Sequence, residues 1–238
     1  YELCSTRRQV LRALSILSNY PLVILDCEGK DLGHAGGALS LLCLGTPVAG
    51  PTQHIFLFDM PALAPCPRAR GALAAFLERG PLKVVWDGRM DAVEIHAALG
   101  IPLTRVLDLQ VAEVVARGAV LGEQDEEREA RLARHQFGWR FVEAHRTAMR
   151  GLHVVRGLQN CVEFYHPDLK VEKDPSVVEM HQAGESHRWL ARPLPANLLS
   201  YAATDIALLA HLLSIFDTLG FFSTSAAHEL LARSERYV

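Results

Sequence analysis

Hydrophobic positions near the start of the chain change from a helical spacing to short continuous runs. Between residues 6 and 19, Val10, Leu14 and Leu17 recur at helical spacing with arginines on the other side, which predicts an amphipathic helix. Three apolar runs follow, bounded by Gly, Pro and Asp as buried strands are: residues 21–25, 39–44 and 54–58. Because the connections between these runs are short, we expect an antiparallel meander.

The middle of the chain alternates between helical and strand-like segments. The pattern predicts helices over residues 68–79 and 90–99, and strands over 83–86 and 105–107. Such alternation indicates parallel strands added beside the meander. From residue 109 onward the pattern is almost wholly helical, and it ends in a long helix over 197–219 with Gly220 directly after it.

These elements predict an α/β fold. Its mixed sheet has three antiparallel strands followed by parallel strands, is flanked by helices, and is joined to a helical C-terminal half. We expect three parts in the chain: an N-terminal helix in residues 1–20, one main domain in 21–222, and a C-terminal helical extension in 223–238. A chain of 238 residues is long enough to bury a substantial core in one such domain.

The composition narrows the class of protein. Half of the residues are hydrophobic and 21% are charged, as in a globular chain, and no apolar run approaches the length that spans a bilayer, so no membrane partner is expected. Five cysteines without a CxxC pair argue against a zinc module or a complete disulfide framework and favour a reducing, intracellular location, nuclear or cytoplasmic. The chain begins at Tyr1, so a trimmed N-terminus leaves organellar targeting open.

Charge is distributed unevenly over residues 122–156. The first nine of them carry five acids and one arginine, whereas residues 131–156 carry six arginines, three histidines and only Glu143. This stretch is either a basic face for a phosphate backbone or a solvated pair of helices whose charges neutralise one another. Because the net charge of the chain is −3, any surface that binds nucleic acid must be local.

Four carboxylates and one tyrosine carry the candidate chemistry. Asp26 and Glu28 end the first predicted strand on the same face, because strand side chains alternate. Asp91 opens a helix, where capping alone would account for it. Tyr201 and Asp205 lie four residues apart in the last long helix and share one side of it, where a polar stripe is the simpler explanation.

Together these residues fit two-metal hydrolysis of a phosphodiester. Mg²⁺ and Mn²⁺ prefer carboxylate oxygen and water, and two such ions clamp the attacking and leaving oxygens of an in-line displacement. Asp26, Glu28, Asp91 and Asp205 can supply the carboxylates from a strand and two helices. Tyr201 would orient the attacking water.

The motifs resemble the DEDD exonucleases of the RNase H-like fold, in the tyrosine-bearing branch with RNase D and the Werner-type exonucleases. The matching segments run over nearly the whole chain, from residue 21 to residue 222: Asp26-Cys-Glu28, Trp86-Asp-Gly-Arg-Met-Asp91, Trp189-Leu-Ala-Arg-Pro-Leu194 and Tyr201-Ala-Ala-Thr-Asp205. The resemblance implies that 21–222 is a 3′-5′ exonuclease domain. It also implies that the domain uses two Mg²⁺ or Mn²⁺ ions to release nucleoside 5′-monophosphates from single-stranded RNA or DNA.

Within that branch, the segment from Asp26 to Gly33 is most similar to the 3′-5′ exonuclease domain-containing and Egalitarian-like proteins. Some members of that subgroup are RNA-binding adaptors that have lost the catalytic acids, so a catalytically silent adaptor is the alternative function. A structural protein with merely exposed carboxylates is the third. All four acids are present here, which favours activity.

Several neighbouring residues have open roles. Cys27, between the two acids, is expected to face away from them, Asp87 to be a loop residue or an outer group of the site, and Asp108 to be structural. His181 and His187 fit the surface better than the site. The choice of RNA or DNA and the oligomeric state stay open, and the possible base-stacking residues Phe137, Trp139 and Tyr165 are equally explained by packing.

Overall fold

The computed structural model describes residues 1–169, 174–222 and 224–238, and the side chains of all of these except 224–226. Its centre is a six-stranded sheet in the order β1-β4-β3-β2-β5-β6. The strands are β1 (Glu2–Cys4), β2 (Leu22–Lys30), β3 (Ala38–Gly45), β4 (Ile55–Asp59), β5 (Leu82–Val85) and β6 (Val106–Asp108). β2, β3 and β4 form the expected antiparallel meander, and β5 and β6 add to β2 in parallel. The predicted mixed sheet is therefore confirmed.

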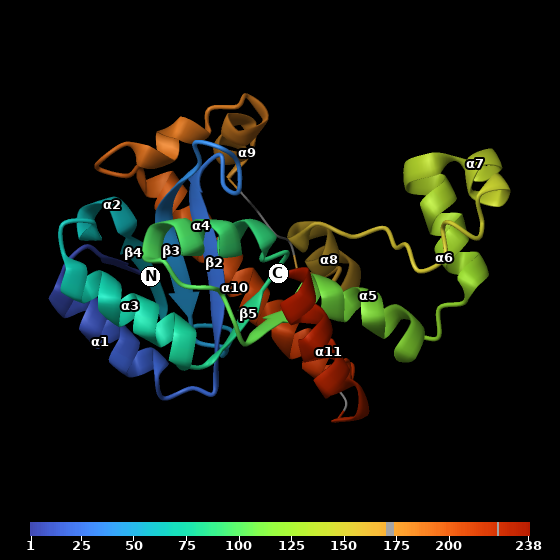
Figure 1. Cartoon of the computed structure of the whole chain (residues 1–238), viewed down its shortest axis with the longest axis horizontal. Helices are drawn as coiled ribbons and strands as arrows, with labels where there is room; N and C mark the ends of the chain where they lie inside the picture. The colour runs from blue at the N-terminus through green and yellow to red at the C-terminus, as the bar shows by residue number, and fades with distance from the viewer. Residues whose placement is uncertain (170–173, 223) are drawn as a thin grey trace.

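Helices cover both faces of the sheet (Figure 1). One face carries α1 (Arg7–Leu17), α3 (Pro67–Arg79) and α4 (Arg89–Leu99), with the short α2 (Met60–Leu63) at its edge. The long α10 (Ala196–Thr218) lies on the other face against β2, β3 and β4, and α11 (Thr224–Tyr237) packs on β6 and α5 (Leu109–Ala119). α10 therefore lies directly beneath the centre of the sheet.

Two features of the sheet differ from the prediction. β1 pairs in parallel with β4, and its three residues are too few to show a strand pattern. β2 continues to Lys30, so Asp26 and Glu28 lie inside a paired strand and not at its end. The strand can continue because it bulges between Glu28 and Gly29, where the backbone of β3 approaches so closely that any side chain would collide with Ala38.

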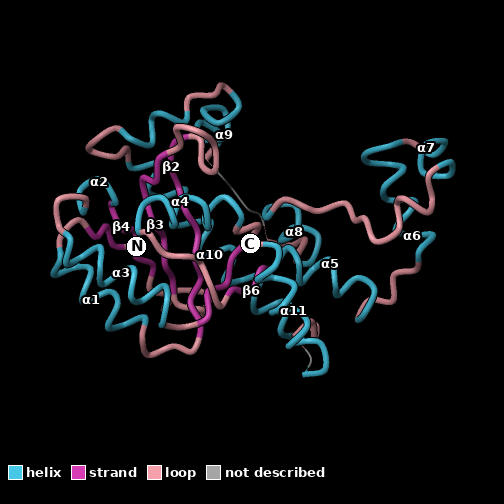
Figure 2. Tube along the Cα trace, viewed as in Figure 1, coloured by secondary structure: helices cyan, strands magenta, loops and turns pink. Residues whose placement is uncertain are grey.

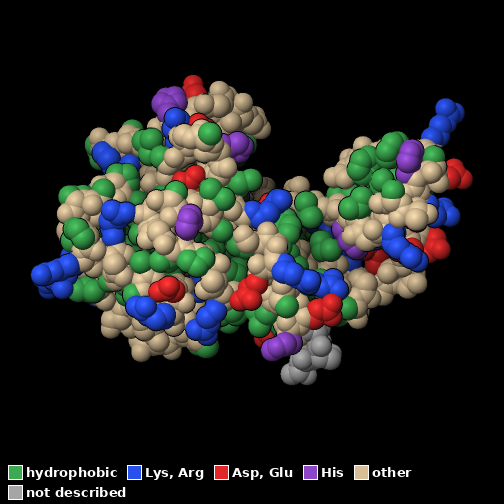
Figure 3. Space-filling view, in the orientation of Figure 1, with side chains coloured by type: hydrophobic (Ala, Val, Ile, Leu, Met, Phe, Trp, Pro, Cys, Tyr) green, Lys and Arg blue, Asp and Glu red, His purple; other side chains and the backbone are tan. Residues whose placement is uncertain are grey.

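The basic stretch forms a small helical arm at one end of the molecule. We use "arm" for residues 120–156, which hold α6 (Asp125–Leu132), a π-helical turn η1 (Ala133–Phe137) and α7 (Trp139–Ala144). The arm projects beyond α5 in Figure 2 and has its own small core around Leu132 and Val142. On the face drawn in Figure 3, lysines and arginines are scattered among acids over the whole molecule, so no broad basic surface forms there.

The remaining helices lead from the arm back to the sheet. They are α8 (Leu158–Tyr165), α9 (Pro175–Gln182) and the 3-10 turn η2 (Ser186–Leu190). Among the described helices, α10 is long and apolar enough to cross a membrane by length and composition, but 56% of its most apolar window is buried inside the protein. α10 therefore serves as a core helix of the folded domain.

An arginine fixes the segment that precedes α10. Arg192 donates hydrogen bonds to Asp59 from Nε and Nη2 at 2.8–3.1 Å, to Ser40 Oγ at 3.0 Å and to the carbonyl of Trp189 at 2.9 Å. Asp59 and Ser40 belong to the ends of β4 and β3, and the Trp189 ring is fully buried. This contact sets the start of α10 relative to the sheet.

A buried carboxylate ties β6 to the loop before α4. Asp108 accepts backbone hydrogen bonds from Gly88 at 3.0 Å, from Asp87 at 3.3 Å, and from Gln110 at 2.8 Å as the N-cap of α5. It is fully buried. Asp108 is thus structural, as expected, and it positions the helix that carries Asp91.

Replacing Asp108 by Ala is expected to lower the free energy of unfolding by about 2–4 kcal/mol, because the N-cap is lost and buried N–H groups of the Gly88 loop lose their acceptor. Asp108→Asn keeps one acceptor oxygen and should cost clearly less. Urea unfolding of the three proteins measures the difference. Equal losses in the two variants would show that hydrogen bonds accepted by Asp108 do not stabilise the loop before α4.

Candidate metal centre

Two of the predicted acids lie in the middle of the sheet. In β2, Asp26 pairs with Cys43 of β3 and Glu28 pairs with Leu41. Both acids share a face with Ile24, which packs in the core that includes α10. Asp26 is half-buried and Glu28 is only 7% exposed. Buried carboxylates of this kind need a cation or hydrogen bonds to offset lost hydration.

α10 brings the third acid and the tyrosine to the same place. Asp205 is 8% exposed, and ligand oxygens of Asp26, Glu28 and Asp205 lie within 4.8 Å of one another. Tyr201, one helical turn before Asp205, lines the same pocket of about 340 Å³. The burial of Glu28 and Asp205 argues against carboxylates that are merely exposed.

Two rings flank Tyr201. Its ring centroid lies 6.4 Å from that of Trp189, which η2 buries completely, and 6.1 Å from that of His181 on α9. His181 is exposed, as expected, yet it also lines the pocket beside Glu28. No spacing in the sequence indicates this placement, because His181 lies on α9, an element separate from those that carry the acids and Tyr201. His187 is exposed and does not line this pocket.

Asp91 approaches the acids from the opposite side of β2. It lies in the first turn of α4 and is 6% exposed. It is not within the group of three close carboxylates. However, Asp26, Glu28, Asp91 and Asp205 all contribute to raising the pKa of the buried Cys43 thiol, although burial is the main cause. The electrostatic influence of all four acids therefore reaches one residue of β3.

Cys27 links Asp91 to β2. Its side chain packs in the core on the α4 side and so faces away from Asp26 and Glu28, as expected. Cys27 nevertheless acts on Asp91, because its thiol and its backbone partly offset the increase in the pKa of that carboxyl. Burial, followed by the charges of Asp91 and Asp26, raises the pKa of the Cys27 thiol well above its usual value.

Burial changes the acidity of Asp91 itself. Loss of hydration raises the pKa of this carboxyl to about 7, against the hydrogen bonds from Cys27, and the charges of Asp108 and Asp87 add to the increase. A divalent cation near the carboxylate would act in the opposite direction. Asp87 itself is a loop residue at φ 52°, and it accepts hydrogen bonds from Arg89 at 2.6 and 2.8 Å.

The donor set fits hard divalent cations. Four carboxylates on three elements offer only oxygen, the ligand that Mg²⁺ and Mn²⁺ prefer, and no thiol or imidazole belongs to the close group among the described residues. Asp26, Glu28 and Asp205 could share one ion, whereas Asp91 lies outside this close group. The arrangement can therefore concentrate positive charge where a phosphate would enter the pocket.

Comparisons with known proteins support the fold. No family model matches the sequence, and no curated protein matches it. Among solved structures, Trypanosoma brucei RNase D is 20% identical with a TM-score of 0.71, over 100% of this chain and 71% of that one. The same enzyme is also known in complex with RNA U12.

Two further structures show the same likeness. The EXO domain of Aedes aegypti Nibbler is 19% identical with a TM-score of 0.61, over 97% of this chain and 93% of that one. Escherichia coli RNase D, an exoribonuclease involved in structured RNA processing, is 19% identical with a TM-score of 0.57, over 99% of this chain and 50% of that one. The resemblance to RNase D-type 3′-5′ exonucleases is thus confirmed for the fold.

The raised pKa of Asp91 predicts a pH effect on the metal-free protein. The fold favours the protonated carboxyl, so the stability that this group contributes is full below its ordinary pKa of 3.8 and is lost as pH rises through about 7. In EDTA, the Tm of the wild type should fall more steeply between pH 5 and pH 8 than that of Asp91→Asn. Parallel Tm profiles for the two proteins would contradict this assignment.

Proposed function

We propose that this chain is a metal-dependent 3′-5′ exonuclease. It hydrolyses phosphodiester bonds at the 3′ end of single-stranded nucleic acid and releases nucleoside 5′-monophosphates. The observation that carries the proposal is the convergence of Asp26, Glu28 and Asp205, whose oxygens lie within 4.8 Å of one another, with Tyr201 in the same pocket. This convergence on an exonuclease fold is difficult to explain by stability alone, because crowded carboxylates repel one another.

The four acids would hold two Mg²⁺ or Mn²⁺ ions. When bound, these ions would lower the pKa of the attacking water and neutralise charge on the phosphate. The residues of the chain position the reactants. The Tyr201 hydroxyl forms a hydrogen bond with the attacking water and aligns that water with phosphorus. Water oxygen bonds to phosphorus as the bond to the 3′ oxygen breaks. The attacking water releases one proton to solvent, and the 3′ oxygen takes up one proton from solvent to form a new 3′ hydroxyl.

Single-stranded RNA is the first substrate to test. T. brucei RNase D, which shares the fold, is known with RNA U12, and the E. coli and T. brucei RNase D enzymes are named for action on RNA. DNA is tested in parallel, since discrimination depends on contacts to the 2′ hydroxyl. The alternative of a catalytically silent adaptor predicts binding without turnover, so a loss-of-turnover variant separates the two.

Turnover is expected to depend on Asp26. A labelled single strand should shorten stepwise with Mg²⁺ or Mn²⁺, and Asp26→Asn should lower the rate by roughly 10²-fold or more, because charge that stabilises the transition state is lost. Strand binding in EDTA should persist in the variant. If the wild type binds RNA and DNA but leaves both intact with either metal, the exonuclease proposal fails and the catalytically silent adaptor replaces it.

Metal binding is expected to stabilise the protein through Asp205. An ion that binds only the native state adds about 2.7 kcal/mol at a free concentration of 100 times its Kd, so Mn²⁺ should raise the Tm of the wild type. Asp205→Asn should remove most of that increase. Asp217→Asn is the matched control, because Asp217 is exposed on the same helix. An equal Mn²⁺ response in both variants would place the ion elsewhere.

A further inference from the structure

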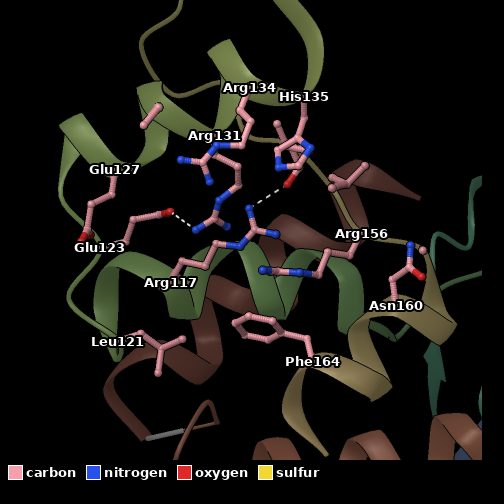
Figure 4. Close-up of a pocket in the computed structure, with 14 residues that line it drawn as sticks. Arg117, Leu121, Glu123, Glu127, Arg131, Arg134, His135, Arg156, Asn160 and Phe164 are labelled. Carbon is pink, nitrogen blue, oxygen red and sulfur yellow. Dashed lines mark hydrogen bonds and ion pairs between the residues drawn. The ribbon is translucent and has the colours of Figure 1, made fainter. Parts of the chain in front are cut away.

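A second pocket lies between the arm and the rest of the protein. Its volume is about 760 Å³, more than twice that of the pocket at the acids. Arg131, Arg134 and His135 line it from the arm, while Arg117 of α5 and Phe164 of α8 line it from the other side (Figure 4). We call it the arm pocket. α8 also packs against α10, the helix of Tyr201 and Asp205.

Two arginines at the floor of the arm pocket share one carboxylate. Glu113 is fully buried and accepts hydrogen bonds from Arg117 Nε at 2.9 Å, from Arg156 Nη1 at 2.5 Å and from Tyr165 Oη at 3.2 Å. The charge of Glu113 neutralises only one of the two guanidinium groups. The Glu113, Arg117 and Arg156 side chains together therefore keep one positive charge below the pocket surface. Little water reaches Arg117, whose side chain is 3% exposed, and its field is therefore weakly screened.

Arg131 adds an unsatisfied donor to this positive site. Its Nη2 forms an ion pair with Glu123, but its Nη1 is buried and has no hydrogen-bond partner among the described residues. Burial lowers the pKa of Arg131, and the positive charge of Arg117 lowers it further. A buried N–H without an acceptor is unfavourable, and the rest of the Arg131 side chain is 26% exposed, so an anion in the pocket would offset its positive charge.

The remaining contacts suit a nucleotide more than a simple anion. Arg134 is exposed and has no ion pair among the described residues. Phe164 is 57% exposed, and the Arg156 guanidinium lies 4.0 Å from its ring centroid. Exposed aromatic rings and guanidinium planes are the surfaces on which unpaired bases stack, and arginines are the usual partners of their phosphates. Figure 4 shows these groups on opposite sides of one space.

We propose that the arm pocket binds one phosphate and one base of a single-stranded nucleic acid, on the 5′ side of the end that enters the catalytic pocket. Arg131 and Arg134 hold the phosphate, and the base stacks at Phe164 and Arg156. This proposal rests on the proposed function, because it assumes that the substrate is a strand. It makes the arm a second point of attachment, which increases the affinity for longer strands.

The test measures strand binding without turnover. A fluorescent single-stranded RNA is titrated with protein in EDTA at several salt concentrations. Arg134→Glu should bind it about tenfold more weakly, with a salt slope smaller by roughly 0.7, the value for one lost contact to a single strand. Phe164→Ala should bind at least about fivefold more weakly. Arg140→Glu is the matched control, because Arg140 is an exposed arginine of the arm outside the pocket.

Turnover of a dinucleotide separates this proposal from the proposed function. A dinucleotide has no spare phosphate for the arm pocket when its only phosphodiester bond lies at the acids. Arg134→Glu should therefore raise the KM for a long strand about tenfold and change the KM for the dinucleotide far less. If no metal supports hydrolysis by the wild type while the binding losses of Arg134→Glu and Phe164→Ala persist, the exonuclease proposal fails and the strand site stands.

Two results would overturn the arm pocket as a strand site. One is equal affinity of Arg134→Glu and Arg140→Glu for the long strand. The other is tight binding of a free nucleoside monophosphate that Phe164→Ala abolishes, while long-strand binding is unchanged by either pocket variant. The second result would assign the pocket to a free nucleotide as a ligand separate from the substrate.

Discussion

Mutual repulsion of carboxylates in a largely buried site is the constraint on which the rest of this structure depends. Asp26, Glu28, Asp91 and Asp205 all contribute to raising the pKa of the buried Cys43 thiol, and the oxygens of Asp26, Glu28 and Asp205 lie within 4.8 Å of one another. Loss of hydration and like charge both oppose such a cluster. A sheet strand and two helices must therefore hold the acids in place against this repulsion.

The rest of the fold supplies that rigid support through two contacts that lie outside the pocket. Asp108 holds the loop before α4, and through it the position of Asp91. Arg192 joins Asp59 and Ser40 to the segment before α10, and so fixes where that helix begins. Both contacts involve buried or half-buried charge, whose strength depends on exclusion of water. Geometry at the acids is thus set by polar contacts at a distance from them.

Short-range patterns in the sequence predicted the mixed sheet, the shared face of Asp26 and Glu28, and the shared face of Tyr201 and Asp205, because strand alternation and helical spacing are local properties. The resemblance to exonucleases supplied the order in which distant elements meet. What the sequence could not show depends on contacts between elements with no periodic signal. His181 reaches the pocket from α9, and Glu113, a helical glutamate that pattern alone would place at the surface, is shared by two arginines. The roles of the five candidate residues stay predictions.

The raised pKa of Asp91 has a consequence for the metal-free protein. A carboxyl that burial makes reluctant to ionise destabilises the metal-free protein near neutral pH, so exchanging it for a neutral residue relieves the fold while removing a candidate ligand. At this one position, the stability of the empty fold and the retention of a carboxylate therefore oppose one another.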